Sequence, residues 1–273
     1  MNCAIVVDST IDIPEDYVCP IPLYILPLRI FIDNKEYKDR VDISCEEIYE
    51  ELEKGKKITT SLPSPSDALS LLQKLSKQFE QIVVLTVSSK LSGTFNMIKM
   101  LVEQMSLKKV NVFDTKAVSG KIFHIVQRVA ADLLKGEKIT QEKILEYNKS
   151  SLMLFVLNSL EYLKKGGRIG KLSAFMGKLF NLKPILSIDE EGEVYKVTTA
   201  KSEEQMIDKI VELVERFAPD RRTVYAGYGK KTMERLVFKL QEKLGKIAGL
   251  ARIGPAVAAH AGPETFGVLV VKE

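Results

Sequence analysis

The chain has 273 residues, of which 45% are hydrophobic and 28% are charged, and its formal net charge is +4. This composition is typical of a folded globular protein and excludes an intrinsically disordered chain. The 40 basic and 36 acidic residues are mixed along the sequence, which argues against a nucleic-acid-binding surface, because such a surface needs clustered basic residues.

The sequence shows neither a membrane span nor a secretion signal. No segment reaches the roughly 20 apolar residues that a bilayer-spanning helix needs. The first residues lack the basic segment of a signal peptide and resemble a strand. Cys3, Cys19 and Cys45 are odd in number and lack metal-ligand spacing. We therefore expect a soluble, cytoplasmic protein with reduced cysteines and no metal or other cofactor.

The first two-thirds of the chain alternate short aliphatic runs with helical patterns, which is typical of stacked β-α-β units. The aliphatic runs show little polar alternation, so we expect a mainly parallel sheet whose strands are buried on both faces. Helices are expected after Ser44 and Ser64, which have the residues of good helix caps, and over Phe95–Met105 and Val118–Leu134. The strand candidates are Cys3–Asp8, Leu23–Ile32, Gln81–Val87, Val110–Phe113 and Leu152–Leu157.

A glycine-rich basic segment over residues 164–171 interrupts this alternation. We place a domain change near residue 160, which predicts an N-terminal α/β domain over residues 1–160 and a C-terminal α/β domain over residues 161–273. The elements expected in the second domain are a helix over Ser173–Phe180, a hairpin turning at 189–192, helices near 203–217 and 230–244, a strand at Thr223–Tyr228 and two short apolar runs.

A hydroxyl-rich loop over residues 88–94 follows the third clear strand and opens a helix. A helix N-terminus has unpaired backbone N–H groups and a partial positive charge. The surrounding hydroxyls of Ser88, Ser89, Ser92 and Thr94 add donors, and Gly93 lets the backbone approach a ligand. The loop therefore predicts a site for a phosphate or a carboxylate; the alternative is one serine cap with the other hydroxyls in water.

Two further polar segments are expected near the same edge of the sheet. Residues 59–65 form a second hydroxyl-rich turn before a helix, and residues 8–10 follow the first strand. Since ligands of parallel α/β sheets bind at the carboxyl ends of the strands, the three loops together predict a site there. For Asp8 we favour bonding to backbone N–H groups of its own loop over a role as acid or base.

Three other polar side chains have two interpretations each. His124 falls inside a predicted helix and is expected to be packed or partly exposed. His260 lies at a predicted strand end before a Gly-Pro turn, where it either donates to an anionic ligand or has a structural role. Arg168, in the basic glycine-rich loop, is either solvated or contacts the anion or a partner protein.

Two other classes of function remain open from these residues. Ser89 or Ser92 with His260 and Asp8 would suit a serine-type acyl hydrolase, although the sequence lacks the G-x-S-x-G turn of many such enzymes. A regulator that binds a phosphate-containing ligand or nucleic acid would use the same anion site, but the even charge balance argues against nucleic acid.

Six short motifs in order along the chain resemble those of the DegV family. The resemblance implies a two-domain α/β protein with a lipid tunnel between the domains, which binds a long-chain fatty acid such as palmitate and performs no chemistry itself. It also implies a partner, a fatty-acid kinase that phosphorylates the bound carboxylate. The motifs are DSTIDIP (8–14), TSLPS (60–64), SSKLSGT (88–94), GGRIGK (166–171), KPIL (183–186) and HAGPETFG (260–267).

The same resemblance implies which residues bind the ligand. The family holds the carboxylate with the Thr of the TS-P-S turn and a Ser of the SS-LSGT loop, which correspond to Thr60 and Ser89. This chain has Leu62 where a Gln is usual and Glu264 where a Gly is usual. Further ligand-binding candidates are Ser61, Ser88, Ser92, Gly93, Arg168 and His260, and candidates for the apolar wall are Phe175, Met176, Leu179, Phe180, Ile185 and Leu186.

Overall fold

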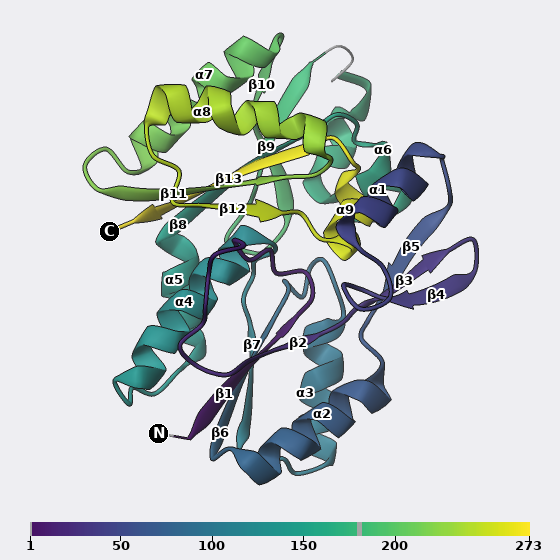
Figure 1. The fold of residues 1–273 in the computed structure, drawn as a ribbon, viewed down its shortest axis with the longest axis vertical. Helices are drawn as coiled ribbons and strands as arrows, with labels where there is room; N and C mark the ends of the chain where they lie inside the picture. Colours follow the sequence, from purple (N-terminus) through teal and green to yellow (C-terminus); the bar gives the residue numbers. More distant parts are fainter. Residues whose placement is uncertain (1, 179–181) are drawn as a thin grey trace.

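The computed structural model describes residues 2–178 and 182–273. Figure 1 shows two α/β units, one above the other, with a small third sheet at the side. This arrangement confirms the predicted mixed α/β class. No helix in the described ranges is both long and apolar enough to cross a membrane. The three cysteines carry free thiols.

The lower unit in Figure 1 contains a parallel four-stranded sheet in the order β2-β1-β6-β7. All six residues of β1 are buried, as its continuous aliphatic run predicts. Helices α2 and α3 pack on one face and α4 and α5 on the other. The strands are β1 (Cys3–Asp8), β2 (Leu23–Leu26), β6 (Gln81–Thr86) and β7 (Val110–Asp114), and the helices are α2 (Pro65–Gln78), α3 (Thr94–Gln104), α4 (Gly120–Leu134) and α5 (Gln141–Lys149).

A three-stranded antiparallel sheet, in the order β4-β3-β5, lies beside this unit. The predicted single strand Leu23–Ile32 is wrong: it divides into β2 and β3, which belong to different sheets. Pro27 separates them and cannot donate to a strand ladder. The elements are β3 (Arg29–Ile32), β4 (Lys35–Lys38), β5 (Ile58–Ser61) and the helix α1 (Cys45–Glu53), whose N-terminus has the predicted capping box.

The upper unit is built on a six-stranded sheet in the order β10-β9-β8-β13-β11-β12. All neighbouring strands are antiparallel except β11 and β12. Helices α7 and α8 cover one face. The strands are β8 (Ser151–Leu157), β9 (Lys183–Ile188), β10 (Val194–Ala200), β11 (Arg222–Tyr228), β12 (Gly249–Arg252) and β13 (Thr265–Lys272), and the helices are α7 (Glu203–Phe217) and α8 (Arg235–Leu244).

Strand β8 departs from the sequence-based expectation. It precedes the boundary predicted near residue 160, yet it pairs with β9 and β13 of the six-stranded sheet rather than with the parallel strands before it. An aliphatic run that is buried on both faces does not indicate which sheet it joins, because either sheet buries it equally well.

Short helical segments complete the described chain. A 3₁₀-helix over Gly170–Lys178 stands where a helix over Ser173–Phe180 is predicted, and the end of that predicted helix lies outside the described residues. His260 belongs to a helix rather than to a strand end, since Pro255 at the first position and a run of alanines favour a helix. These segments are α6 (Glu161–Lys165), α9 (Pro255–Ala261) and a 3₁₀-helix at Lys231–Glu234.

Candidate functional site

A cavity of about 300 Å³ is enclosed by loops of the lower unit and strands of the upper unit. The loops follow β1, β6 and β7, as expected for the carboxyl edge of a parallel sheet. The other side is formed by the face of the six-stranded sheet that α7 and α8 leave uncovered. Thr60, Arg168 and His260 lie together at one end of the cavity. Further polar residues, Thr10, Asp12, Ser119 and Thr265, line its wall, and the rest of the lining is largely apolar.

The polar end is organised around a contact between Thr60 and His260. Thr60 lies in β5 rather than in a turn, paired with Ile30 of β3. Its Oγ1 is 2.7 Å from Nε2 of His260, which α9 supplies. Ser61, Ser92 and Arg168 also line this end of the cavity.

His260 is held in its neutral form. Burial, assisted by the nearby Arg168 guanidinium, lowers the pKa of His260 to about 4. Its Nδ1 is buried and has no hydrogen-bond partner among the described residues. The proton of the neutral ring is therefore best placed on Nε2, where it donates to Thr60 Oγ1. The Thr60 hydroxyl hydrogen is then free to donate into the cavity.

The serines of the hydroxyl loop have different surroundings. Ser88 is buried and donates to the carbonyl of Gly192, 2.8 Å away. The Ser89 hydroxyl accepts from Nζ of Lys116 at 3.2 Å, and its backbone N–H donates to Asp114. Neither of these serines lines the cavity, whereas Ser92 does. The structure thus brings Ser92, not Ser89, to the same cavity as Thr60.

Two other predicted residues of this region are also placed. Gly93 precedes α3 and does not line the cavity. Arg168 donates from Nε to the carbonyl of Leu91 at 3.0 Å, so it supports the hydroxyl loop while facing the cavity. Gly166 leaves room for the His260 ring, because a Cβ there would lie 2.0 Å from Nδ1.

Asp8 and His124 have the structural roles that the sequence favours. The Asp8 carboxylate accepts from the Thr10 hydroxyl and from the Val87 N–H, each at 2.6 Å, so it joins the loops after β1 and β6. Burial raises the pKa of Asp8. His124 is packed in α4, with Nε2 2.9 Å from the Ser150 hydroxyl.

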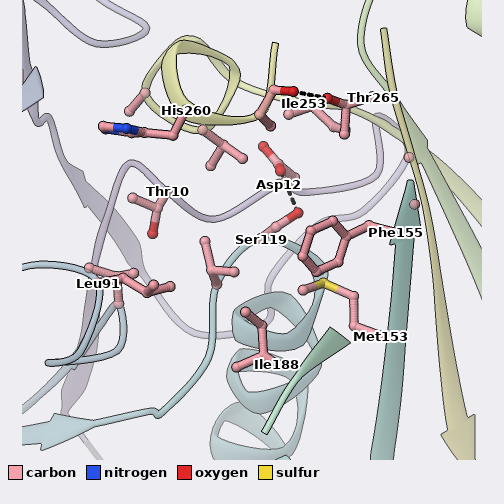
Figure 2. A pocket seen from close by; sticks show the side chains of 18 of the residues that line it. Thr10, Asp12, Leu91, Ser119, Met153, Phe155, Ile188, Ile253, His260 and Thr265 are labelled. Atoms are coloured by element: carbon pink, nitrogen blue, oxygen red, sulfur yellow. Dashed lines mark hydrogen bonds between the residues drawn. The ribbon is translucent and has the colours of Figure 1, made fainter. Parts of the chain in front are cut away.

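A buried polar cluster around Asp12 is missed by the sequence reasoning. Figure 2 shows Asp12 and Ser119 in the middle of the pocket wall, and the Ser119 hydroxyl donates to Asp12 at 2.5 Å. Asp12 also accepts from Arg40 at 2.5 Å and from the Gly254 N–H at 2.8 Å. Asp12 lies within the DSTIDIP motif, but its partners are distant in the sequence, so only the fold reveals the cluster.

The apolar part of the cavity is formed by side chains from both units. In Figure 2, Met153 and Phe155 of β8 lie across the pocket from His260. The apolar lining includes Leu28, Leu62, Val87, Leu91, Val118, Phe123, Met153, Phe155, Leu163, Ile188, Val194, Tyr225, Ile253 and Leu269.

Three of the predicted wall residues, Phe175, Ile185 and Leu186, have described side chains and are not among these lining residues. The Phe175 ring packs against Nζ of Lys196. Ile185 belongs to the core under α7 and α8, whereas Leu186 belongs to the core on the cavity side. Leu179, Phe180 and the side chain of Met176 lie outside the described part of the chain.

Leu62 and Glu264, the two residues that differ from those usual in the resembled family, lie in different places. The Glu264 carboxylate is 3.0 Å from Nζ of Lys230, which also contacts the Glu53 carboxylate at 2.7 Å, and Glu264 does not line the cavity. Leu62 lines the cavity, so an apolar side chain stands where an amide is usual.

These contacts do not form a Ser-His-Asp triad. His260 bonds Thr60, and the Asp8 carboxylate is occupied by Thr10 and Val87. A triad needs a serine bonded to one nitrogen of the imidazole and a carboxylate bonded to the other. Among the described residues, His260 therefore has neither a serine nor a carboxylate partner.

Comparisons with known proteins identify the family of this chain. A family model described as an uncharacterised protein of the DegV family matches residues 2–273. A DegV domain-containing protein of Clostridium acetobutylicum is 33% identical over 279 residues, which covers 99% of each chain. A structure described as fatty acid binding of a DegV family protein from Thermus thermophilus is 28% identical, with a TM-score of 0.89 and complete coverage of both chains. A stearic acid-binding protein from Eubacterium ventriosum is 25% identical, with a TM-score of 0.85 and coverage of 98% and 97%. The chain belongs to the DegV family.

Proposed function

We propose that this protein binds a long-chain fatty acid, with the carboxylate at the Thr60–His260 end of the cavity and the acyl chain against the apolar lining. The observation that carries the proposal is a mainly apolar cavity in which the Thr60 hydroxyl, held by His260, lies together with the Arg168 cation. The Ser119 and Thr265 hydroxyls elsewhere in the wall already donate to protein groups. Fatty-acid binding by the relatives from Thermus thermophilus and Eubacterium ventriosum supports it.

The head group is bound by Thr60 and Ser92 in this proposal. His260 directs the Thr60 hydroxyl into the cavity, and Ser92 faces the same space. Arg168 supplies a positive charge, but its Nε is already bonded to Leu91. Ser92 replaces Ser89 as the second ligand, since Ser92 lines the cavity and Ser89 does not. The Ser92 Oγ accepts from the Thr94 N–H at 3.3 Å and lies 2.9 Å from Thr94 Oγ1, so in this proposal Thr94 donates to Ser92 and the Ser92 hydroxyl hydrogen is left for the carboxylate.

The acyl chain supplies most of the affinity. Burying about fourteen methylene groups contributes roughly 11 kcal/mol at ~0.8 kcal/mol each, before the costs of association. A charge-assisted hydrogen bond adds only about 1.5–3 kcal/mol. The hydroxyls therefore orient the acid and select for a carboxylate.

The proposal includes presentation of the bound acid to a fatty-acid kinase. Thr60, Ser92 and Arg168 are each partly exposed, so in this proposal a kinase reaches the carboxylate that they bind. The kinase, not this chain, would catalyse attack of a carboxylate oxygen on the terminal phosphorus of ATP, releasing ADP and leaving an acyl phosphate.

Native mass spectrometry of the purified protein tests lipid binding. We expect a bound long-chain acid, and rebinding of palmitate after lipid removal. Thr60→Val and Ser92→Ala should each raise the Kd for palmitate about tenfold or more, because each removes a charge-assisted hydrogen bond. Ser89→Ala is the matched control and should leave the Kd unchanged.

The outcomes separate the parts of the proposal. The absence of bound acid together with failure to bind palmitate would refute the function. A larger loss in Ser89→Ala than in Ser92→Ala would refute the head-group assignment alone. For kinase presentation, ATP and a purified bacterial fatty-acid kinase should convert the bound palmitate to a species that hydroxylamine traps as a hydroxamate; no hydroxamate would contradict that part.

A further inference from the structure

A row of four residues, of which three are small and the fourth is Phe155, crosses the middle of the six-stranded sheet. In the strand register, Gly267 of β13 pairs with Phe155 of β8 on one side and with Gly227 of β11 on the other. Gly227 in turn pairs with Ala251 of β12. Residues directly opposite each other in a sheet point to the same face. All four line the cavity, so this row faces the cavity.

The backbone conformation does not require glycine at positions 227 and 267 of this row. Neither Gly227 nor Gly267 is among the residues with positive φ. Alanine therefore fits their dihedral angles. Glycine in a strand interior is also less stable than alanine, because the unfolded chain loses more conformational freedom on folding.

Packing within the protein does not explain them either. A Cβ at Gly227 would lie 3.7 Å from the Ala251 carbonyl oxygen and 3.8 Å from Cγ1 of Ile253. A Cβ at Gly267 would lie 3.7 Å from the Leu154 carbonyl oxygen and 3.8 Å from Cβ of Phe155. These are ordinary van der Waals distances, so the protein has room for a methyl group at both positions.

Gly249 lies at the edge of the neighbouring row of the sheet, and at this position packing within the protein does explain the glycine. It pairs with Tyr225 across β11 and β12. A Cβ there would lie 2.9 Å from Cβ of Pro14, so packing within the protein requires a glycine. Gly227 and Gly267 have no such neighbour, and the space above them belongs to the cavity.

The paired glycines create a trough across the sheet. On one side of the row stand Met153, Leu269 and Tyr225, which follow the same register and line the cavity. Since alternate residues of a strand are about 6.7 Å apart, a row without side chains leaves roughly 13 Å between its flanking rows. Phe155 closes one end of the trough, across the pocket from His260 in Figure 2.

We infer that Gly227 and Gly267 form the floor of the channel for the distal acyl chain, and that this floor with Phe155 sets the chain length that the protein accepts. The inference rests on the proposed fatty-acid function. A long acid reaches the trough, whereas a shorter one ends among the side chains nearer the polar end.

Binding of laurate and stearate to Gly227→Val and Gly267→Val tests the inference. Each added side chain fills the trough, so the Kd for stearate should rise about tenfold or more while the Kd for laurate changes little. Gly227→Ala and Gly267→Ala should raise the Kd for stearate a few-fold and leave the Kd for laurate little changed. The Tm of these variants in the lipid-free state should equal or exceed that of the wild type. Gly55→Ala is the control: Gly55 does not line the cavity and a Cβ there would meet no atom within 4 Å, so the ratio of the two Kd values should stay that of the wild type.

Two results would overturn the inference: wild-type stearate affinity in all four trough variants, or equal weakening of laurate and stearate. If the valine variants do not fold, the alanine variants decide by the same ratio. A wild-type protein that binds neither acid would instead refute the proposed function.

Discussion

Asp39 follows β4 and is fully buried, and neither of its carboxylate oxygens has a hydrogen-bond partner among the described residues. Burial raises the pKa of Asp39 to about 6 from an ordinary value of 3.8, although the nearby Ser9 hydroxyl and Arg40 oppose this rise. A folded-state pKa above the unfolded one means that the group favours folding at low pH. That contribution is lost as the pH rises through about 6.

The Asp39→Asn variant should therefore be more stable than the wild type at pH 7.5. The pKa difference between about 6 and 3.8 corresponds to an upper limit of about 3 kcal/mol in the free energy of unfolding. The advantage should fall to about 0.5 kcal/mol near pH 4, where the folded wild type is protonated at Asp39 and the unfolded chain is still partly ionised. Urea denaturation at both pH values measures the difference in the free energy of unfolding between variant and wild type. Asp220→Asn, at an exposed position, is the control. A difference that stays constant with pH would contradict the prediction.

At the scale of single residues, the sequence identifies most of the polar end but not its details. Thr60, Arg168 and His260 stand out because hydroxyl, cationic and imidazole groups occur in short polar motifs. The choice between Ser89 and Ser92 depends on loop dihedral angles and on Lys116, which comes from the loop after β7. Such a contact between distant segments is not visible in one sequence.

The hairpin between β9 and β10 connects the two units through its turn. Gly192 in this turn accepts from the Ser88 hydroxyl, has a φ of +87°, and would place a Cβ 2.0 Å from Ser88 Oγ. The hydroxyl loop is thus supported by the upper unit at Gly192 and again at Arg168.

Gly192→Ala should destabilise the protein more than a matched glycine substitution. Gly55 has a φ of +72°, and a Cβ at this position would have no neighbouring atom within 4 Å, so Gly55→Ala measures only the cost of positive φ, about 1–2 kcal/mol. Gly192→Ala adds the steric conflict with Ser88 and should cost at least about 1 kcal/mol more. Chemical denaturation of both variants measures the difference, and equal losses would show that the turn does not depend on this contact.

At the scale of elements, continuous aliphatic runs predict β1, β6 and β7, and hydroxyl caps predict the starts of α1 and α2. The hydrophobic pattern does not predict strand boundaries or sheet membership where these depend on pairing between distant strands. Pro27 divides one predicted strand between two sheets, and β8 joins antiparallel neighbours that occur more than 25 residues later in the chain. Short strands such as β4, which has no buried residue, lack a hydrophobic pattern altogether.

For the whole molecule, the cavity draws on both units, so a bound ligand should stabilise the folded state of each. At a free ligand concentration of 100 times the Kd, the free energy of unfolding rises by about 2.7 kcal/mol. For a chain of this size that corresponds to a Tm increase of roughly 5–10 °C.

Thermal unfolding of lipid-free protein with added palmitate measures this increase. Methyl palmitate is the matched control, because it has the same chain without a carboxylate and should raise the Tm less. Equal shifts with both compounds would show that the polar end does not recognise the acid.

The position of β13 has a consequence for biosynthesis. This strand lies between β8 and β11 in the six-stranded sheet, yet it follows every other strand of that sheet in the sequence. During translation, which adds about 5–20 residues per second, the parallel sheet can pair once β7 has emerged from the ribosome. The upper sheet must wait for residues 265–272. Because β13 also carries Gly267 and Leu269, which line the cavity, the cavity is complete only after this strand has been synthesised and has paired with β8 and β11.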